Sequence, residues 1–216
     1  MEIKYLGHSA FEIETNGKRI LTDPFLVCSP NYKPLSVSDI FVTHGHGDHI
    51  GSAVELSKTY NAPITAVFEL ANYFSKQGAA AIDAGLGSWL QYNWGRAILV
   101  PAFHSSSLPN GNYAGCPCGI IFDIEGQKIY HAGDTALNSE MKMIGEVYKP
   151  DIAMLPIGGK YTMDIENAVI AAQWLGASSI IPMHYNTFGA IQVDISKFEQ
   201  EIRRIGKNPI IKTIEK

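Results

Sequence analysis

The N-terminal part of the chain alternates between apolar and polar residues with a period of two, which is typical of strands that are buried on one face. Residues 2–6 and 10–14 carry this alternation, and Asn16-Gly17 supplies a hairpin turn into a third strand at residues 19–22. The chain is therefore expected to open as antiparallel sheet.

Further along, short apolar runs alternate with segments of helical period. The runs predict strands at residues 40–43, 64–67, 97–101, 118–124, 127–131, 152–155, 179–182 and 209–214, and helices are predicted near residues 52–60, 68–76, 138–147, 164–175 and 194–204. The glycine-rich stretch 78–96 is assigned to no element. Hairpins together with helices in both halves predict an α/β fold of two packed sheets with helices outside, as one domain over residues 1–216.

Composition narrows the classes of partner. Of the 216 residues, 46% are hydrophobic and 18% are charged, as expected of a globular chain and not of a disordered one. The net charge of −4 gives no electrostatic reason to expect a large nucleic acid as a partner, and no polybasic segment indicates a membrane surface. A small-molecule substrate is the expected partner, and a homo-oligomer is left open.

Cysteine usage and the N-terminus indicate a compartment. The three cysteines, Cys28, Cys116 and Cys118, do not form the even-numbered set of a disulfide framework. The sequence begins without the apolar core of a signal peptide, and no apolar run approaches the roughly 20 residues that span a bilayer. We therefore expect a soluble, cytoplasmic protein.

A loop with the sequence THGHGDHIG concentrates the candidate chemistry. It follows an apolar strand and places three histidines and one aspartate close together. His44 and His46 can face one point, while the glycines let the backbone turn Asp48 and His49 toward a neighbouring point. Imidazole and carboxylate groups are ligands that suit zinc, iron or manganese.

Three other predicted strands also end in a candidate ligand. Functional groups gather where strands end, because the sheet fixes positions and the loops carry the side chains. The four strand ends together offer five histidines and two aspartates, enough for two metal ions. The spacing favours the following partition: His44, His46 and His104 on one ion, Asp48, His49 and His184 on the other, and Asp134 bridging both.

These residues resemble a known family. The histidine loop is similar to the H-x-H-x-D-H signature of the metallo-β-lactamase superfamily. The flanking motifs LGHS, LTDP, AFHS, HAGDT and PMHYNTF are similar to the UlaG-like metal-dependent hydrolases, most of all to their small single-domain branch. The resemblance runs from residue 3 to about residue 202. It implies a four-layer αββα sandwich with a dinuclear metal site, and the family's ligands give the same partition.

The resemblance also implies a mechanism. Two zinc ions would lower the pKa of bound water towards about 7, so that a bridging hydroxide attacks an ester-type bond. A phosphodiester is favoured, and a lactone or thioester is the alternative. Asp48 is expected to handle the proton of the attacking water, and His8, in a motif near the family's cleft, is the second catalytic candidate. A metal hydroxide makes a serine nucleophile unnecessary, so the serine run 105–107 is interpreted as loop.

Other polar residues have weaker, supporting roles. Asp23 is expected to accept hydrogen bonds from the histidine loop, with an ordinary turn cap as the alternative. His131 and Thr135 are expected to support the metal ligands, and Tyr185 and Asn186 to contact substrate. Simple packing is the alternative for Thr135, Tyr185 and Asn186. For His131, a core or supporting position is favoured over direct metal ligation.

Two other classes of protein, an iron-dependent oxidoreductase and a non-catalytic module, are alternatives to a hydrolase. Some members of the superfamily hold iron and act as oxidoreductases, but the diiron reductases replace the second histidine of the motif with a carboxylate, whereas His46 is intact here. A non-catalytic module would be expected to lose ligands, and all seven positions are filled. The prediction is therefore a metal-dependent hydrolase, with zinc favoured and manganese, nickel and iron as alternatives.

Overall fold

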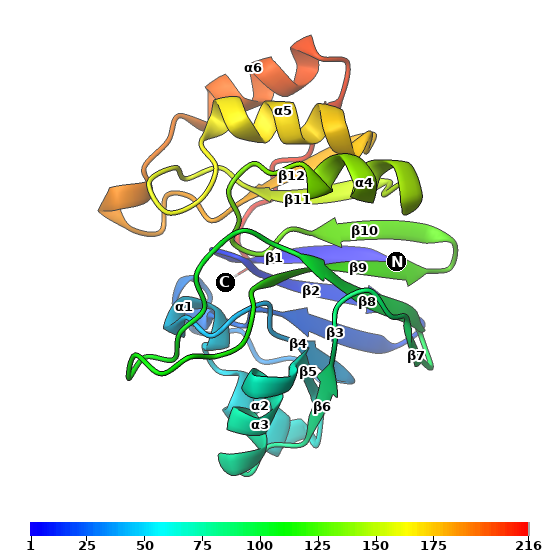
Figure 1. The fold of residues 1–216 in the computed structure, drawn as a ribbon, viewed down its shortest axis with the longest axis vertical. Helices are drawn as coiled ribbons and strands as arrows, with labels where there is room; N and C mark the ends of the chain where they lie inside the picture. The colour runs from blue at the N-terminus through cyan, green and yellow to red at the C-terminus, as the bar shows by residue number, and fades with distance from the viewer. Residues whose placement is uncertain (216) are drawn as a thin grey trace. The chain divides into compact units, whose positions relative to one another are not determined.

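The computed structural model describes residues 1–215, and its backbone separates into two compact units. Unit 1 contains Met1–Ser88, Ser105–Pro117 and the C-terminal residues from Thr213, and unit 2 contains Trp89–His104 and Cys118–Lys212. Each unit has one mixed sheet with its own helices (Figure 1). The predicted α/β class with two sheets is confirmed, and the single domain stays a prediction.

Unit 1 holds a sheet of six strands in sequence order. Its antiparallel part consists of β1 (Glu2–Gly7), β2 (Ala10–Thr15) and β3 (Lys18–Thr22). Asn16 and Gly17 have φ angles of 47° and 72°, which the predicted two-residue turn between β2 and β3 requires.

The remaining strands of unit 1 run parallel to β3, and parallel neighbours need a crossover between them. Helices α2 and α3 provide two of these crossovers and pack against β5. The elements of this part are η1 (Leu26–Cys28), β4 (Asp39–Phe41), α1 (Gly47–Ile50), α2 (Ala53–Tyr60), β5 (Ile64–Val67), α3 (Phe68–Lys76) and β6 (Ala81–Ala84).

Unit 2 holds a sheet of seven strands in the order β13-β12-β11-β10-β9-β8-β7. Strands β7 to β10 pair antiparallel, and β10 to β13 pair parallel. The strands are β7 (Leu90–Tyr92), β8 (Gly95–Pro101), β9 (Cys118–Ile124), β10 (Gln127–His131), β11 (Ile152–Pro156), β12 (Ser179–Met183) and β13 (Asn208–Pro209).

The helices of unit 2 lie together beside the parallel strands (Figure 1). Helix α5 packs on α4, α6 and β11, and its buried face carries small and aliphatic residues. The helices are α4 (Glu140–Val147), α5 (Ile165–Leu175), η2 (Gly189–Ile191) and α6 (Ile195–Arg204). Among the described residues, no helix combines the length and the apolar character needed to cross a bilayer.

Two stretches differ from the sequence prediction. The unassigned residues 78–96 contain β6, β7 and the first two residues of β8, and Trp94 of that stretch is buried against Phe122. The predicted strand 209–214 is wrong, since β13 ends at Pro209. The chain leaves the sheet of unit 2 there, and Ile214 instead forms an isolated bridge with Tyr5 of unit 1.

Candidate functional site

The histidine loop of unit 1, residues 43–51, follows β4 and contains the short helix α1, which carries Asp48 and His49. Two glycines allow its compact path. A Cβ on Gly45 would lie 2.3 Å from the Cβ of Ala114, and a Cβ on Gly51 would lie 2.3 Å from the carbonyl oxygen of Pro24. Gly51 also has a φ of 44°, which L side chains rarely adopt. The loop therefore folds tightly only because these positions lack side chains.

The candidate ligands of unit 1 crowd together. His44 Nε2 lies 2.9 Å from His46 Nδ1, and the rings of His44 and His49 are 4.1 Å apart between centroids. His8 Nε2 donates to Asp48 Oδ2 at 3.1 Å, and one ligand atom from each of His8, Asp48 and His49 lies within 4.8 Å of the others. His8, His44 and His49 are buried, while His46 and Asp48 are half-buried.

Asp23 holds one of these histidines in place. Its buried carboxylate accepts hydrogen bonds from the backbone N–H of Thr43 at 2.8 Å, from Thr43 Oγ1 at 2.7 Å and from His49 Nδ1 at 2.7 Å. The bond to Nδ1 fixes the orientation of the His49 ring and assigns Nε2 to any metal. Asp23 therefore connects β3 to the histidine loop by the contacts that the sequence suggested.

Sequence reasoning missed two neighbours of the histidine loop and one neighbour of His8. Ser106 Oγ accepts from the backbone N–H of Gly45 at 3.2 Å, and Ser105 Oγ lies 3.4 Å from His46 Nε2. The ring of Phe25 packs edge-on against His8, 5.6 Å between centroids. The serine run is a loop, as predicted, but it also contacts the histidine loop. The only sequence signal for this contact is that Ser105 ends the AFHS motif and Ser106 follows it directly.

Unit 2 contributes the remaining candidate ligands. His184 Nε2 lies 3.0 Å from Asp134 Oδ2, and His104 Nε2 lies 3.5 Å from the same oxygen. Asp134 and His184 are buried, and His104 is half-buried. These three side chains come from the ends of β8, β10 and β12, so the sheet of unit 2 brings together residues that are far apart in sequence.

Thr135 and His131 shape the loops that carry these ligands. Thr135 Oγ1 accepts from the backbone N–H of Phe103 at 3.1 Å and donates to the carbonyl of Ala136 at 2.8 Å. It thus ties the residue before His104 to the loop of Asp134. His131 Nδ1 accepts from the backbone N–H of Gly133 at 3.2 Å, within the turn that leads to Asp134.

The two predicted substrate contacts differ in their surroundings. Tyr185 is half-buried, and burial raises the pKa of its phenol. Asn186 pairs with the backbone of Val193: its Nδ2 donates to the carbonyl at 3.2 Å, and its Oδ1 accepts from the N–H at 2.7 Å. The Asn186 side chain therefore closes its own loop. A substrate contact stays a prediction for both residues.

The donor atoms of both units fit a divalent metal. Each set combines imidazole nitrogens with a carboxylate in a largely buried environment, which suits zinc, iron or manganese. Four of the predicted site residues also have positive φ angles: 56° at His8, 41° at Asp23, 53° at His184 and 55° at Asn186. Such backbone strain is typical of functional sites, where the surrounding structure enforces it.

Comparison with known proteins relates the chain to a family of sequences. A sequence model described as the β-lactamase superfamily domain matches residues 2–184. The chain is 45% identical over 212 residues to a protein of Bacillus cereus (strain B4264) described as a UPF0173 metal-dependent hydrolase, with 94% of this chain and 93% of that one covered.

Two solved structures are similar to the whole chain. Igni18, described as a novel metallo hydrolase from the hyperthermophilic archaeon Ignicoccus hospitalis, matches with a TM-score of 0.90 and 36% identity over 99% of this chain and 95% of its own. YhfI of Bacillus subtilis, described as a metallo-β-lactamase fold protein, matches with a TM-score of 0.76 and 14% identity over 97% of this chain and 94% of its own. The second match bears on the fold alone.

Proposed function

We propose a function from the following premise: the chain belongs to the β-lactamase superfamily and, within it, to the UPF0173 family of metal-dependent hydrolases. This membership confirms the predicted superfamily, and the structural neighbours confirm the metallo-β-lactamase fold. The chain is accordingly a metal-dependent hydrolase. We propose below which metals it uses and which bond it cleaves.

The proposed cofactor is a pair of divalent ions, with zinc favoured over manganese, nickel and iron. The support is the chemistry of the donor set and the H-x-H-x-D-H signature. The proposed ligands are the seven that the sequence indicates: His44, His46 and His104 for one ion, Asp48, His49 and His184 for the other, and Asp134 for both.

The proposed reaction is hydrolysis of an ester-type bond, a phosphodiester first and a lactone or thioester as the alternative. When bound, the ions would activate water and polarise the bond that is cleaved. Asp48 accepts the proton of the attacking water at a carboxylate oxygen, and His8 orients that carboxylate through its bond to Oδ2. The observation that carries this assignment is the close grouping of His8, Asp48 and His49 in unit 1, within 4.8 Å.

Elemental analysis of the purified chain, prepared without chelator, tests the metals. Hydrolysis of bis-p-nitrophenyl phosphate, before and after zinc, manganese or iron is added, tests the reaction. Two metals per chain with metal-dependent cleavage would support the proposal. Two metals without cleavage would shift it to lactones and thioesters. Iron in a coloured protein would favour an oxidoreductase, and no metal even after reconstitution would overturn the ligand assignment.

The variant Asp48→Asn tests the proton transfer. Loss of a general base lowers turnover by about 100-fold or more, and one oxygen remains for the metal. The expected result is low activity with unchanged metal content. The control Asp83→Asn changes an exposed aspartate of β6 and should leave activity unchanged. Full turnover in Asp48→Asn with its metals bound would remove this role.

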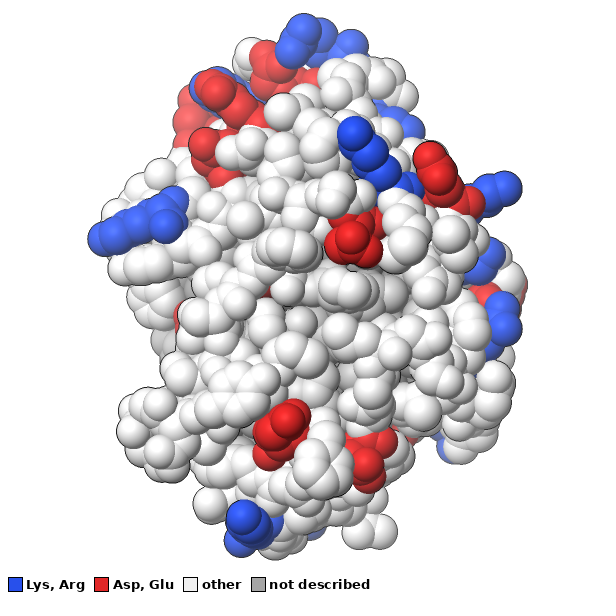
Figure 2. Space-filling view, in the orientation of Figure 1, with Lys and Arg blue, Asp and Glu red and all other residues white. Residues whose placement is uncertain are grey.

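The proposed partner is a small-molecule substrate in a reducing, cytoplasmic compartment. Most of the face shown in Figure 2 is uncharged, and its lysine and arginine side chains form only small groups, several of them beside aspartate or glutamate, so no large basic surface for nucleic acid occurs on that face. All three cysteines are free thiols, which is compatible with a reducing compartment.

A further inference from the structure

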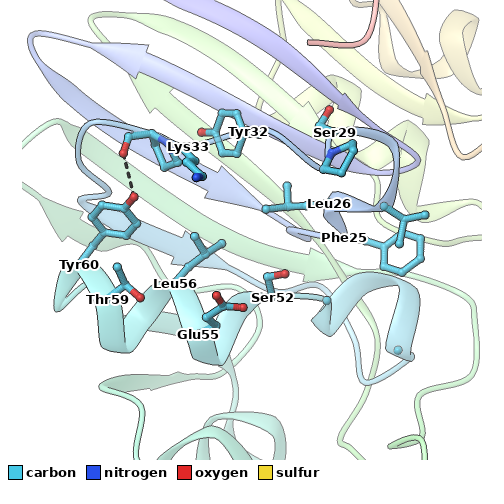
Figure 3. Close-up of a pocket in the computed structure, with 15 residues that line it drawn as sticks. Phe25, Leu26, Ser29, Tyr32, Lys33, Ser52, Glu55, Leu56, Thr59 and Tyr60 are labelled. Atoms are coloured by element: carbon cyan, nitrogen blue, oxygen red, sulfur yellow. Dashed lines mark hydrogen bonds between the residues drawn. The ribbon is translucent and has the colours of Figure 1, made fainter. Parts of the chain in front are cut away.

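A cavity of about 590 Å³ lies within unit 1 beside α1 (Figure 3). One wall is the segment 25–34, which includes η1, and the other wall is α2. Gly47 and Gly51 of the α1 region also line it, but no predicted metal ligand is among the described residues that do so. The volume lies in the range of about 300–1,000 Å³ that is typical of small-molecule sites.

The middle of the cavity is apolar. Leu26 on one wall and Leu56 on the other point into the space between the walls, and the ring of Tyr32 lies above them in the view of Figure 3. Leu26 is half-buried and offers most of this apolar surface, while Leu56 is buried and contributes a smaller part. An apolar group of a few carbon atoms could bury its surface here.

Two opposite charges face each other across this apolar middle. Lys33 belongs to the first wall and Glu55 to α2, and Figure 3 shows both charged ends turned toward the cavity. Both residues are exposed, and in the described part of the chain neither forms an ion pair or hydrogen bond. A ligand with an anionic and a cationic end could therefore be recognised by two charges that the fold itself does not use.

The wall that carries Lys33 is held in place at several points. Tyr60 donates a hydrogen bond to the carbonyl of Pro34 at 2.8 Å, drawn as the dashed line in Figure 3. Tyr32 donates to the buried carboxylate of Glu12, and Ser29 Oγ donates to the carbonyl of Leu6 at 2.9 Å. The cavity is thus preformed, which reduces the entropic cost of binding.

We propose that this cavity binds a small zwitterion with an apolar body, such as an apolar amino acid or dipeptide. Glu55 takes the ammonium group, Lys33 takes the carboxylate, and Leu26 and Leu56 contact the apolar body. A purely anionic ligand would meet the charge of Glu55, and a purely cationic one would meet Lys33. The assignment uses no metal ligand and does not depend on the reaction proposed above.

Calorimetric titration of the purified chain with L-leucyl-L-leucine tests the proposal. The N-acetylated dipeptide lacks the ammonium group, and the dipeptide amide lacks the carboxylate. Each is expected to bind about fivefold more weakly than the zwitterion, because a partly exposed ion pair contributes up to about 1 kcal/mol. Equal binding of all three ligands would overturn the proposal, and so would the absence of saturable binding.

Variants then locate the site. Glu55→Gln is expected to weaken dipeptide binding about fivefold and to abolish discrimination against the N-acetylated form, while Lys33→Met does the same for the amide. Both residues are exposed, so the fold should persist, and thermal unfolding checks this. The matched control Lys58→Met changes an exposed α2 residue that does not line the cavity. Dipeptide binding that neither Lys33→Met nor Glu55→Gln alters would place the ligand elsewhere, including on the metals, and overturn the proposal.

Discussion

At the scale of single residues, a buried carboxylate that serves several donors is hard to replace. Asp23 accepts two bonds from Thr43 and one from His49, and its own φ of 41° costs backbone energy. The structure bears that cost at a residue whose side chain orients a candidate ligand. Asp23 is therefore expected to matter both to stability and to metal binding.

The substitution Asp23→Asn separates these two effects. The amide keeps the shape but presents an NH₂ group to a buried donor, so the free energy of unfolding should fall by roughly 1–3 kcal/mol. Zinc affinity should fall by about 10- to 100-fold if Asp23 orients His49. Urea unfolding and competition with a zinc chelator measure the two. Lower stability with unchanged zinc affinity would leave Asp23 only a structural role.

Tyr32 makes the free energy of unfolding depend on pH in the alkaline range. Burial, together with the hydrogen bond to Glu12, raises the pKa of its phenol far above the ordinary value of about 10. The folded state thus keeps the proton that the unfolded state loses. The stability that Tyr32 contributes is complete below pH about 10 and is lost as the pH rises further.

The variant Tyr32→Phe tests this linkage. At neutral pH the Glu12 carboxylate loses a donor, and the free energy of unfolding should fall by about 1–2 kcal/mol. Above pH 10 or so the variant should lose stability less steeply than the parent chain, since one titrating group is gone. Tyr130 and Tyr185 also have raised pKa values, so some slope remains. Parallel pH profiles of the two proteins would contradict the prediction.

At the scale of elements, capping distinguishes two helices. Asp164 begins α5, and its side chain accepts the backbone N–H of Asn167 at 2.9 Å. Ser139 precedes α4 without such a bond, because Asn138 Oδ1 accepts from the backbone N–H of Glu140 instead. The residue that precedes the helix therefore caps α5 with its side chain but does not cap α4.

This difference predicts unequal effects of alanine. Asp164→Ala should lower the free energy of unfolding by about 1 kcal/mol, as the loss of a helix cap does. Ser139→Ala, the matched control, should change it by less than about 0.5 kcal/mol. Urea unfolding of both variants measures the contrast, and equal losses would show that the two caps do not differ in solution.

At the scale of the whole molecule, metal binding should be coupled to stability. A metal that binds only the folded chain stabilises it by about 2.7 kcal/mol at a concentration 100 times its Kd. Removal of metal with a chelator should therefore lower the thermal midpoint, and added zinc should restore it. The variant His44→Ala should respond less than the parent chain, and the exposed control Asp83→Asn should respond fully. An unchanged thermal midpoint after chelation would show that metal binding does not stabilise the folded chain.

Much of the fold can be predicted from local sequence. Strands β5, β9 and β10 and helix α3 have the bounds that periodicity indicates, and the Asn16-Gly17 turn forms as expected. These elements are encoded within a few neighbouring residues, where alternation and capping act directly. The candidate ligands also stand out locally, because the histidine loop and the strand ends carry unusual donors for their surroundings.

Other features depend on contacts between residues that are distant in sequence. The hydrogen bonds of Ser106 with Gly45 and of Tyr32 with Glu12, and the place of Ile214 beside Tyr5, join segments that no local pattern relates. Hydrogen bonds require particular distances and angles, and these exist only after the backbone has been placed. Local sequence thus specifies the helices and strands and the donor groups at their ends. The tertiary structure decides which side chains orient the candidate ligands and where a cavity forms, because both depend on contacts between segments that are distant in sequence.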